Sequence, residues 1–134
     1  MKRVATLLGA AGMLTVSSAT LACGVCVGDK VAVTYDHAVV RAAIEARRQV
    51  VFVALDGPDA TRAGTRIAAA ATRVKGVDRA SLRYAPSPPA FSFALAQGAP
   101  PDAAVAAFRS AVGGMKVRMT VIRLMRDGAL VDPQ

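Results

Sequence analysis

Two cysteines in a CxxC spacing are the residues of this chain best suited to chemistry. Cys23 and Cys26 stand in the stretch LACGVCVGDK, residues 21–30, and they are the only cysteines among 134 residues. Two thiolates three residues apart can chelate one soft ion, and Cu(I) or Zn(II) suits such ligands. The same pair could instead form a short structural disulfide, take part in thiol–disulfide exchange or, through Cys23, carry a lipid.

Two other side chains are considered as ligands of a soft metal. Met115 follows the glycine pair 113–114 and offers a thioether, although packing in a core is the common role of methionine. His37 lies about 16 Å from Cys26 along a straight helix, too far to share an ion with it, so we expect it to pack against apolar neighbours. Cys23, Cys26 and secondarily Met115 are the predicted metal ligands. No catalytic residue is predicted, because no spacing supports a hydrolase triad and the sequence has no phosphate-binding glycine loop.

Residues 1–22 have the pattern of a secretory signal peptide. Two basic residues precede the apolar run Val4–Val16, which is too short for a convincing membrane span, and small residues end in Ala22. Cleavage would then leave Cys23 as the first residue of a periplasmic or secreted protein, with its α-amine as a further potential ligand. Lipoprotein processing at Cys23 stays open as the alternative, but Leu21 stands one position later than that enzyme prefers.

The charge balance is basic, with 17 Lys and Arg against 9 Asp and Glu and a net charge of +8. In a cytosolic protein such a balance would suggest nucleic acid. The arginines are spread along the chain, and an exported protein rarely meets nucleic acid, so we predict no such partner. The partners that we expect are a metal-transfer protein or a second copy of the chain, and a membrane only if Cys23 is lipidated.

A helix is predicted immediately after the cysteines. Asp29 is the expected N-cap, and the segment 29–46 has an apolar stripe formed by Val33, His37, Val40 and Ile44. A helix N-terminus favours the thiolate form of a cysteine, which is the form that binds metal.

The following segments alternate between strand and helix patterns. Val50–Leu55 is a continuous apolar run typical of a strand covered on both faces. A helix over 60–75 and a hairpin of strands at 81–84 and 91–95 follow. The next helix starts near Pro101, with an apolar stripe of Val105, Phe108 and Val112. The last strand begins at 116, and its alternation slips at Ile122, which suggests a bulge.

The order of these elements indicates an α+β fold. The order β-α-β-β-α-β is the split arrangement of the ferredoxin-like fold, an antiparallel sheet with helices on one face. We therefore predict a CxxC segment and extra N-terminal helix over 23–49, a ferredoxin-like domain over 50–126 and a C-terminal tail over 127–134. Because Val50–Leu55 is apolar on both sides, the N-terminal helix or a dimer partner should cover the open face of the sheet.

Residues 50–126 contain, in order, the stretches RIAAAATRVKGVDRASLRY, FSFAL and APPDAAVAAFRSAVGGMKV. In order and apolar pattern these stretches resemble the helices and strands of the heavy-metal-associated domain family of copper chaperones and metal-pumping ATPases. This resemblance implies a ferredoxin-like fold. This chain is degenerate, because the family carries its metal-binding CxxC in the loop after the first strand, and that loop, LDGPDATRAG at 55–64, has no cysteine. The family's metal ligands therefore cannot be carried over at their usual positions.

The N-terminal helix could bring the cysteines to the end of the sheet at which the family binds its metal. A helix of roughly 26 Å folded back along a strand of roughly 20 Å would overhang the strand's C-terminal end and bring the cysteines near Gly57 and Met115. The leading hypothesis is thus a non-enzymatic protein that binds or handles Cu(I) or Zn through Cys23 and Cys26. The alternatives are an interaction module with a structural disulfide and a thiol–disulfide oxidoreductase, whose motif would normally follow a strand.

Overall fold

The structure of the protein is a computed structural model that describes residues 26–133. The predicted signal peptide 1–22, Cys23 and Gln134 lie outside the described residues. The elements, in chain order, are α1 (Val27–Ala32), α2 (His37–Glu45), β1 (Arg48–Asp56), the 3-10 helix η1 (Ala60–Arg62), α3 (Gly64–Ala71), β2 (Val77–Pro86), β3 (Pro89–Ala96), α4 (Pro101–Ala111), β4 (Arg118–Arg126) and β5 (Ala129–Val131).

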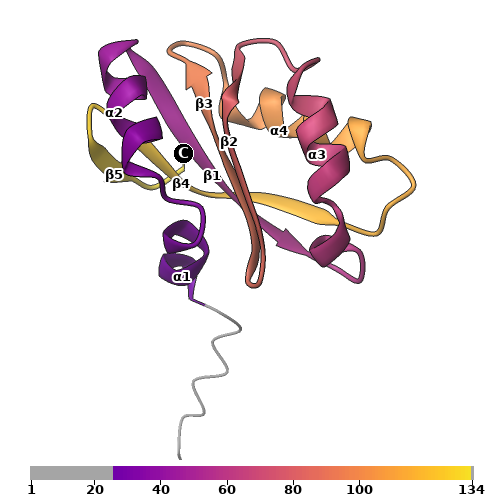
Figure 1. Ribbon diagram of the computed structural model, residues 1–134. Coiled ribbons are helices and arrows are strands. Elements are labelled where there is room, and N and C mark those ends of the chain that lie inside the picture. The colour runs from indigo at the N-terminus through magenta and orange to yellow at the C-terminus, as the bar shows by residue number, and fades with distance from the viewer. Residues whose placement is uncertain (1–25, 134) are drawn as a thin grey trace, which may run out of the picture.

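The strands form one antiparallel sheet, and the fold is α+β, as predicted (Figure 1). The strand order is β2-β3-β1-β4-β5, so the apolar strand β1 lies in the middle. Val50–Leu55 is buried throughout, because side chains that alternate along β1 enter two different cores on the two faces of the sheet.

The first core lies between the sheet and the helices α3 and α4, which are on the right in Figure 1. Its centre is a cluster of three aromatic rings. The ring centroid of Phe108, from α4, lies 5.1 Å from that of Phe91 and 5.0 Å from that of Phe93. Val105 and Val112 are also buried in this core, so the apolar stripe predicted for the helix that begins at Pro101 is confirmed.

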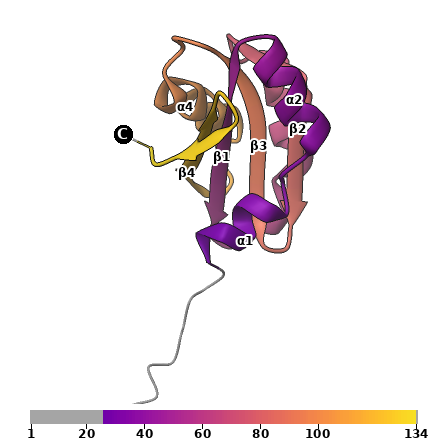
Figure 2. The same ribbon diagram turned by 90° about the vertical axis from the view of Figure 1, so that its left-hand side faces the viewer.

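The second core lies on the opposite face, where α1 and α2 cover β1 (Figure 2). Phe52 is its largest side chain and is 1% exposed. Ala94 of β3 is small enough to let the helices approach. The prediction that the N-terminal helical segment covers this face is confirmed. The buried members of the core are Val31, Val39, Val40, Ala43, Val50, Phe52, Ala94 and Met125.

The prediction of one continuous helix over 29–46 is wrong, because α1 ends at Ala32 and α2 begins at His37. The hydroxyl of Thr34 donates to the carbonyl oxygens of Lys30 and Val31, and the carboxylate of Asp36 accepts from the first backbone N–H groups of α2. Side chains that bond to nearby backbone groups compete with a continuous helix. The break turns most of the predicted stripe outward: Val33, His37 and Ile44 are exposed, and only Val40 is buried.

The later elements follow the prediction more closely. Ile122 is the extra residue of β4, because Phe52 pairs with Arg123 whereas Val53 pairs with Val121. The predicted bulge is therefore confirmed. The helix expected over 60–75 consists of η1 and the shorter α3. The segment 127–134, expected as a tail, contains β5, which pairs with the end of β4.

Candidate functional site

Cys26 directly precedes α1 and is exposed. It is the N-cap residue of this helix, since its carbonyl oxygen accepts from the backbone N–H groups of Asp29 at 2.9 Å and Lys30 at 3.3 Å. The cap is therefore Cys26 rather than the predicted Asp29, which lies in the first turn. Cys23, the other half of the predicted pair, lies outside the described residues.

An ion pair fixes α1 to the end of β1. Nζ of Lys30 lies 3.2 Å from Oδ1 of Asp56, and the Lys30 side chain is only 14% exposed, whereas that of Asp56 is 53% exposed. Asp56 is the last residue of β1 and directly precedes Gly57. Lys30 is one helical turn from Cys26, so α1 reaches the corner of the sheet at which a folded-back helix was expected to arrive.

The corner itself is a tightly bonded turn formed by the DGPD segment and Lys116. The backbone N–H of Lys116 donates to Oδ2 of Asp59 at 2.8 Å, and the N–H of Asp59 donates to the carbonyl oxygen of Lys116 at 3.3 Å. Arg62 also pairs with the Asp59 carboxylate. The hydrogen bond from Lys116 and then that from Arg62 hold the pKa of Asp59 below its usual value. Asp59 thus has a structural role in this turn.

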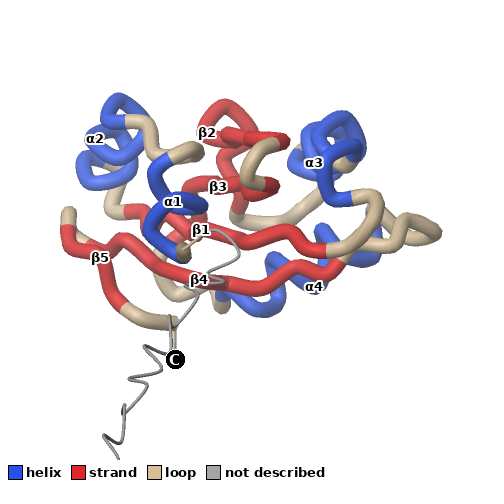
Figure 3. Tube along the Cα trace, turned by 90° about the horizontal axis from the view of Figure 1, so that it is seen from below, coloured by secondary structure: helices blue, strands red, loops and turns tan. Residues whose placement is uncertain are grey.

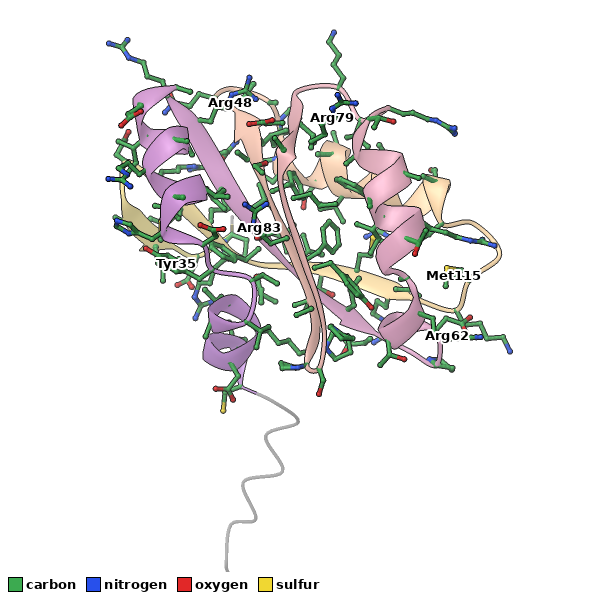
Figure 4. The ribbon with its side chains drawn as sticks, in the orientation of Figure 1. Tyr35, Arg48, Arg62, Arg79, Arg83 and Met115 are labelled. Carbon is green, nitrogen blue, oxygen red and sulfur yellow. The ribbon has the colours of Figure 1, made fainter. Side chains whose placement is uncertain are left out.

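Met115 lies on the other side of the sheet from α1. It follows α4, is partly buried and packs against the core beneath α3 and α4, whereas α1 packs against the second core. Figure 4 shows Met115 on the loop after α4, on the same side as Arg62. The structure therefore gives Met115 a packing position and does not bring it to the helix that Cys26 begins.

His37 is the first residue of α2 and is exposed, so the expectation that it packs on an apolar stripe is wrong. Within residues 26–133, no group of three or more His, Cys, Asp or Glu side chains converges in a way that could hold a metal ion. In the same part of the chain, no helix is long and apolar enough to cross a membrane.

The network between α1 and α2 was not predicted from the sequence. Oδ2 of Asp36 lies 2.9 Å from Nε of Arg83, and Oδ1 accepts from the N–H groups of Ala38 at 2.8 Å and Val39 at 3.3 Å. The bond from Arg83, then those from Val39 and Ala38, keep the pKa of Asp36 below its usual value. An Asp just before an apolar-periodic run is an N-cap signal, and it could have indicated the break.

A buried hydrogen bond fastens the connection between α1 and α2 to the sheet. Oγ of Ser92, on β3, donates to the carbonyl oxygen of Thr34 at 2.9 Å. Together with the pair between Asp36 and Arg83, it anchors the chain between the two helices over β2 and β3. Two contacts therefore set the position of α1, and hence of Cys26. Lys30 binds the end of β1, and the connection after α1 binds β3.

Comparison with known proteins identifies no relative of this chain. No protein-family model, no curated protein and no solved structure is significantly similar to it. The arrangement described above is therefore interpreted from its own residues: an exposed thiol at the start of a helix that is bonded to the corner of an antiparallel sheet.

Proposed function

We propose that this protein is an exported, non-enzymatic protein that binds or handles a soft metal ion through Cys23 and Cys26. The observation that carries the proposal is the exposure of Cys26 at the start of a helix that side-chain bonds hold in place. A metal site that exchanges its ion with a partner needs thiols that the partner can reach. The carbonyl oxygen of Cys26 accepts hydrogen bonds from backbone N–H groups of α1, so these bonds fix the backbone at the second cysteine of the pair.

The number of donors favours Cu(I) over Zn(II). Structural zinc is almost always held by four protein ligands, whereas the sequence has two cysteines and one histidine, and no three His, Cys, Asp or Glu side chains converge within residues 26–133. His37 begins α2, separated from Cys26 by all of α1. Two thiolates, with the α-amine of Cys23 if the chain is cut before it, form a small and soft ligand set, which suits Cu(I).

We further propose that the domain is a degenerate heavy-metal-associated domain with a ferredoxin-like fold. The order β2-β3-β1-β4 with antiparallel neighbours supports this assignment, as do α3 and α4 on one face. The turn after β1 carries Gly57 and Asp59 where the family has its cysteines. In this proposal the thiols come instead from the N-terminal segment, and Lys30 brings that segment to the same corner of the sheet.

The proposed location is the periplasm or the cell exterior. It rests on residues 1–22, whose basic start, apolar run and small residues before Cys23 are those of a signal peptide. Lipidation of Cys23 remains the alternative outcome of processing. The partner would be a metal-transfer protein. The alternative of an interaction module was motivated by an uncovered face of the sheet. That motive is gone, because α1 and α2 already cover β1.

The test is a Cu(I) titration of the reduced full-length protein against a colorimetric chelator of known affinity. The expected result is one bound ion per chain, with binding abolished in the double variant Cys23→Ser/Cys26→Ser. Met115→Leu, which conserves volume and removes the sulfur, is the matched control and should bind as the wild type does. Unchanged affinity in the double cysteine variant would overturn the proposal.

The same titration separates the alternative roles of the thiols. A reduced chain that binds no Cu(I), and whose disulfide has a reduction potential below about −300 mV, would mark the pair as a structural disulfide. A higher potential without metal binding would favour thiol–disulfide exchange. A loss of affinity in Met115→Leu would bring the thioether back as a ligand.

A further inference from the structure

The exposed apolar side chains of the protein are gathered on one side. Among residues 26–133, five large hydrophobic side chains are between 38% and 51% exposed, and α1, α2, their connection and β5 carry all of them. Figure 2, in which this side faces the viewer, shows α1 and the β4–β5 hairpin in front of the sheet. The five residues are Val27, Val33, Tyr35, Ile44 and Leu130.

Three of these residues, Val27, Tyr35 and Leu130, line one groove of about 380 Å³ between α1 and β5. Val27, Val31 and Tyr35 line it from the N-terminal segment, and Leu130 and Arg123 line it from the hairpin. Arg123, its one charged lining residue, pairs with Asp132 at 3.0 Å. We call this surface, together with Ile44, the α1–β5 face.

Ile44 connects α2 to the same surface. A Cβ atom added at Gly128, in the turn before β5, would lie 3.4 Å from Cδ1 of Ile44. The side chain of Ile44 therefore lies beside the turn of the hairpin that carries Leu130. Monomeric proteins usually scatter exposed hydrophobic residues singly, so a set gathered on one side marks a surface that contacts something apolar.

The N-terminal sequence indicates what that apolar partner is. The groove begins at Val27, and the chain before it contains the apolar run Val4–Val16 and the potential lipidation site Cys23. Cys23 precedes Val27 by four residues, which span at most about 14 Å. If an acyl group on Cys23 holds the protein at a membrane, the described surface nearest the attachment point is therefore the α1–β5 face.

Charge favours an anionic membrane. Lys2 and Arg3 are two of the 17 basic residues, so residues 26–133 carry 15 basic against 9 acidic side chains, a net charge of +6. The groove has no acidic lining residue, and the carboxylate beside it is that of Asp132, which pairs with Arg123. Tyrosine is enriched at the level of lipid headgroups, and arginine can extend from an apolar surface toward them. Tyr35 and Arg123 thus suit the boundary between water and lipid.

We propose that the α1–β5 face lies against the surface of a phospholipid bilayer with anionic headgroups, with Tyr35 and Leu130 at the boundary of headgroups and acyl chains. Stable attachment to a membrane generally needs two signals, and this face would be the second signal beside the N-terminal segment. The face would also keep the metal-binding thiols close to the membrane. The proposal itself does not depend on whether they bind metal.

The test uses the absence of tryptophan from the sequence, which lets one introduced tryptophan report its own surroundings. Leu130→Trp places the probe on the α1–β5 face. Ala106→Trp, on the exposed side of α4, is the matched control on the opposite side of the sheet. Both full-length variants are bound to phosphatidylethanolamine–phosphatidylglycerol vesicles that contain brominated lipids, and circular dichroism verifies that both are folded.

Both variants carry the same N-terminal segment, so any binding through it is common to both, and the position of each probe decides the result. We expect a blue shift and strong quenching for Leu130→Trp, greatest for bromines about 5–10 Å below the headgroup boundary. Ala106→Trp should keep the emission of a water-exposed indole. Equal quenching of both probes, or quenching of neither, would overturn the proposal.

Two further outcomes identify other occupants. A blue shift of Leu130→Trp without vesicles, together with a dimer mass in sedimentation, would assign the face to a second copy of the chain and overturn the membrane proposal. Equal quenching in neutral phosphatidylcholine vesicles would overturn the role of anionic headgroups. Weaker quenching in neutral vesicles, relieved further by salt, would support that role.

Discussion

Nζ of Lys30 lies 3.2 Å from Oδ1 of Asp56, although the two residues are 26 positions apart in the sequence. This contact joins the helix that follows Cys26 to the last residue of the central strand. The largely buried Lys30 side chain spans from α1 to the edge of the DGPD turn. The candidate thiol segment is thereby attached to the end of β1 by one side chain. Figure 3, seen from below, shows α1 next to β1.

Removing this attachment should loosen α1 more than it destabilises the protein. In Lys30→Met the aliphatic part of the side chain stays packed, and a partly exposed ion pair is worth no more than about 1 kcal/mol, so the free energy of unfolding should fall by less than that. Hydrogen exchange measured by mass spectrometry should show faster exchange of the α1 amides. Arg62→Met removes a different pair, that with Asp59, and should leave α1 exchange unchanged. Equal exchange of α1 in wild type and Lys30→Met would show that other contacts hold the helix.

Gly57 is required at the DGPD turn for two reasons that can be separated. Its φ is +116°, and an added Cβ would overlap the carbonyl oxygen of Lys116. Gly57→Ala should therefore lower the free energy of unfolding by about 3–5 kcal/mol, the sum of backbone strain and steric overlap. Urea denaturation followed by circular dichroism measures the loss.

Gly98 is the matched control for this substitution. Its φ is +85°, but an added Cβ would meet no atom within 4 Å. Gly98→Ala should cost only the backbone strain, about 1–2 kcal/mol. A similar loss in Gly57→Ala and Gly98→Ala would mean that the turn can move away from Lys116, and that the corner is less rigid than its hydrogen bonds indicate.

The loss of folding stability at low pH should depend on the carboxylates of Asp36 and Asp59. The pKa values of both carboxylates are lowered in the folded protein, mainly by the hydrogen bond from Arg83 for Asp36 and by that from the N–H of Lys116 for Asp59. A lowered folded pKa adds stability above the unfolded pKa, and this stability is lost as the pH falls through the folded values. Unfolding by urea at pH 6 and pH 3 should therefore show a smaller loss of stability in Asp36→Asn/Asp59→Asn than in wild type. Equal losses in the two proteins would contradict this assignment.

The sheet and its main core could be predicted because each depends on local pattern. The run Val50–Leu55 is apolar without interruption, and its strand is buried on both faces. The slip in alternation at Ile122 marks the bulge, because a side-chain period of two cannot continue past an inserted residue. Phe108 lies on the predicted apolar stripe of its helix. In these cases the periodicity of the sequence and the burial of the side chains have the same cause.

The N-terminal region was predicted less well, because its structure depends on bonds between distant residues. Periodicity alone favours one helix through Val33 and Ile44, but the hydroxyl of Thr34 and the carboxylate of Asp36 bond to backbone groups and interrupt it. Those two apolar residues then lie exposed, which a helical pattern cannot show. The contact of Lys30 with Asp56 likewise has no local signal in the sequence.

Asp36 both caps α2 and pairs with Arg83, and two substitutions separate these roles. Asp36→Asn keeps an oxygen that can accept from the N–H groups of Ala38 and Val39, since asparagine caps helices about as well as aspartate. Asp36→Ala removes both the cap and the ion pair. Because a capping bond to orphan N–H groups usually outweighs an exposed ion pair, the midpoint of urea denaturation should fall clearly in the alanine variant and little in the asparagine variant. Equal shifts in the two variants would mean that the pair with Arg83, rather than the cap, holds the connection between α1 and α2 onto β2.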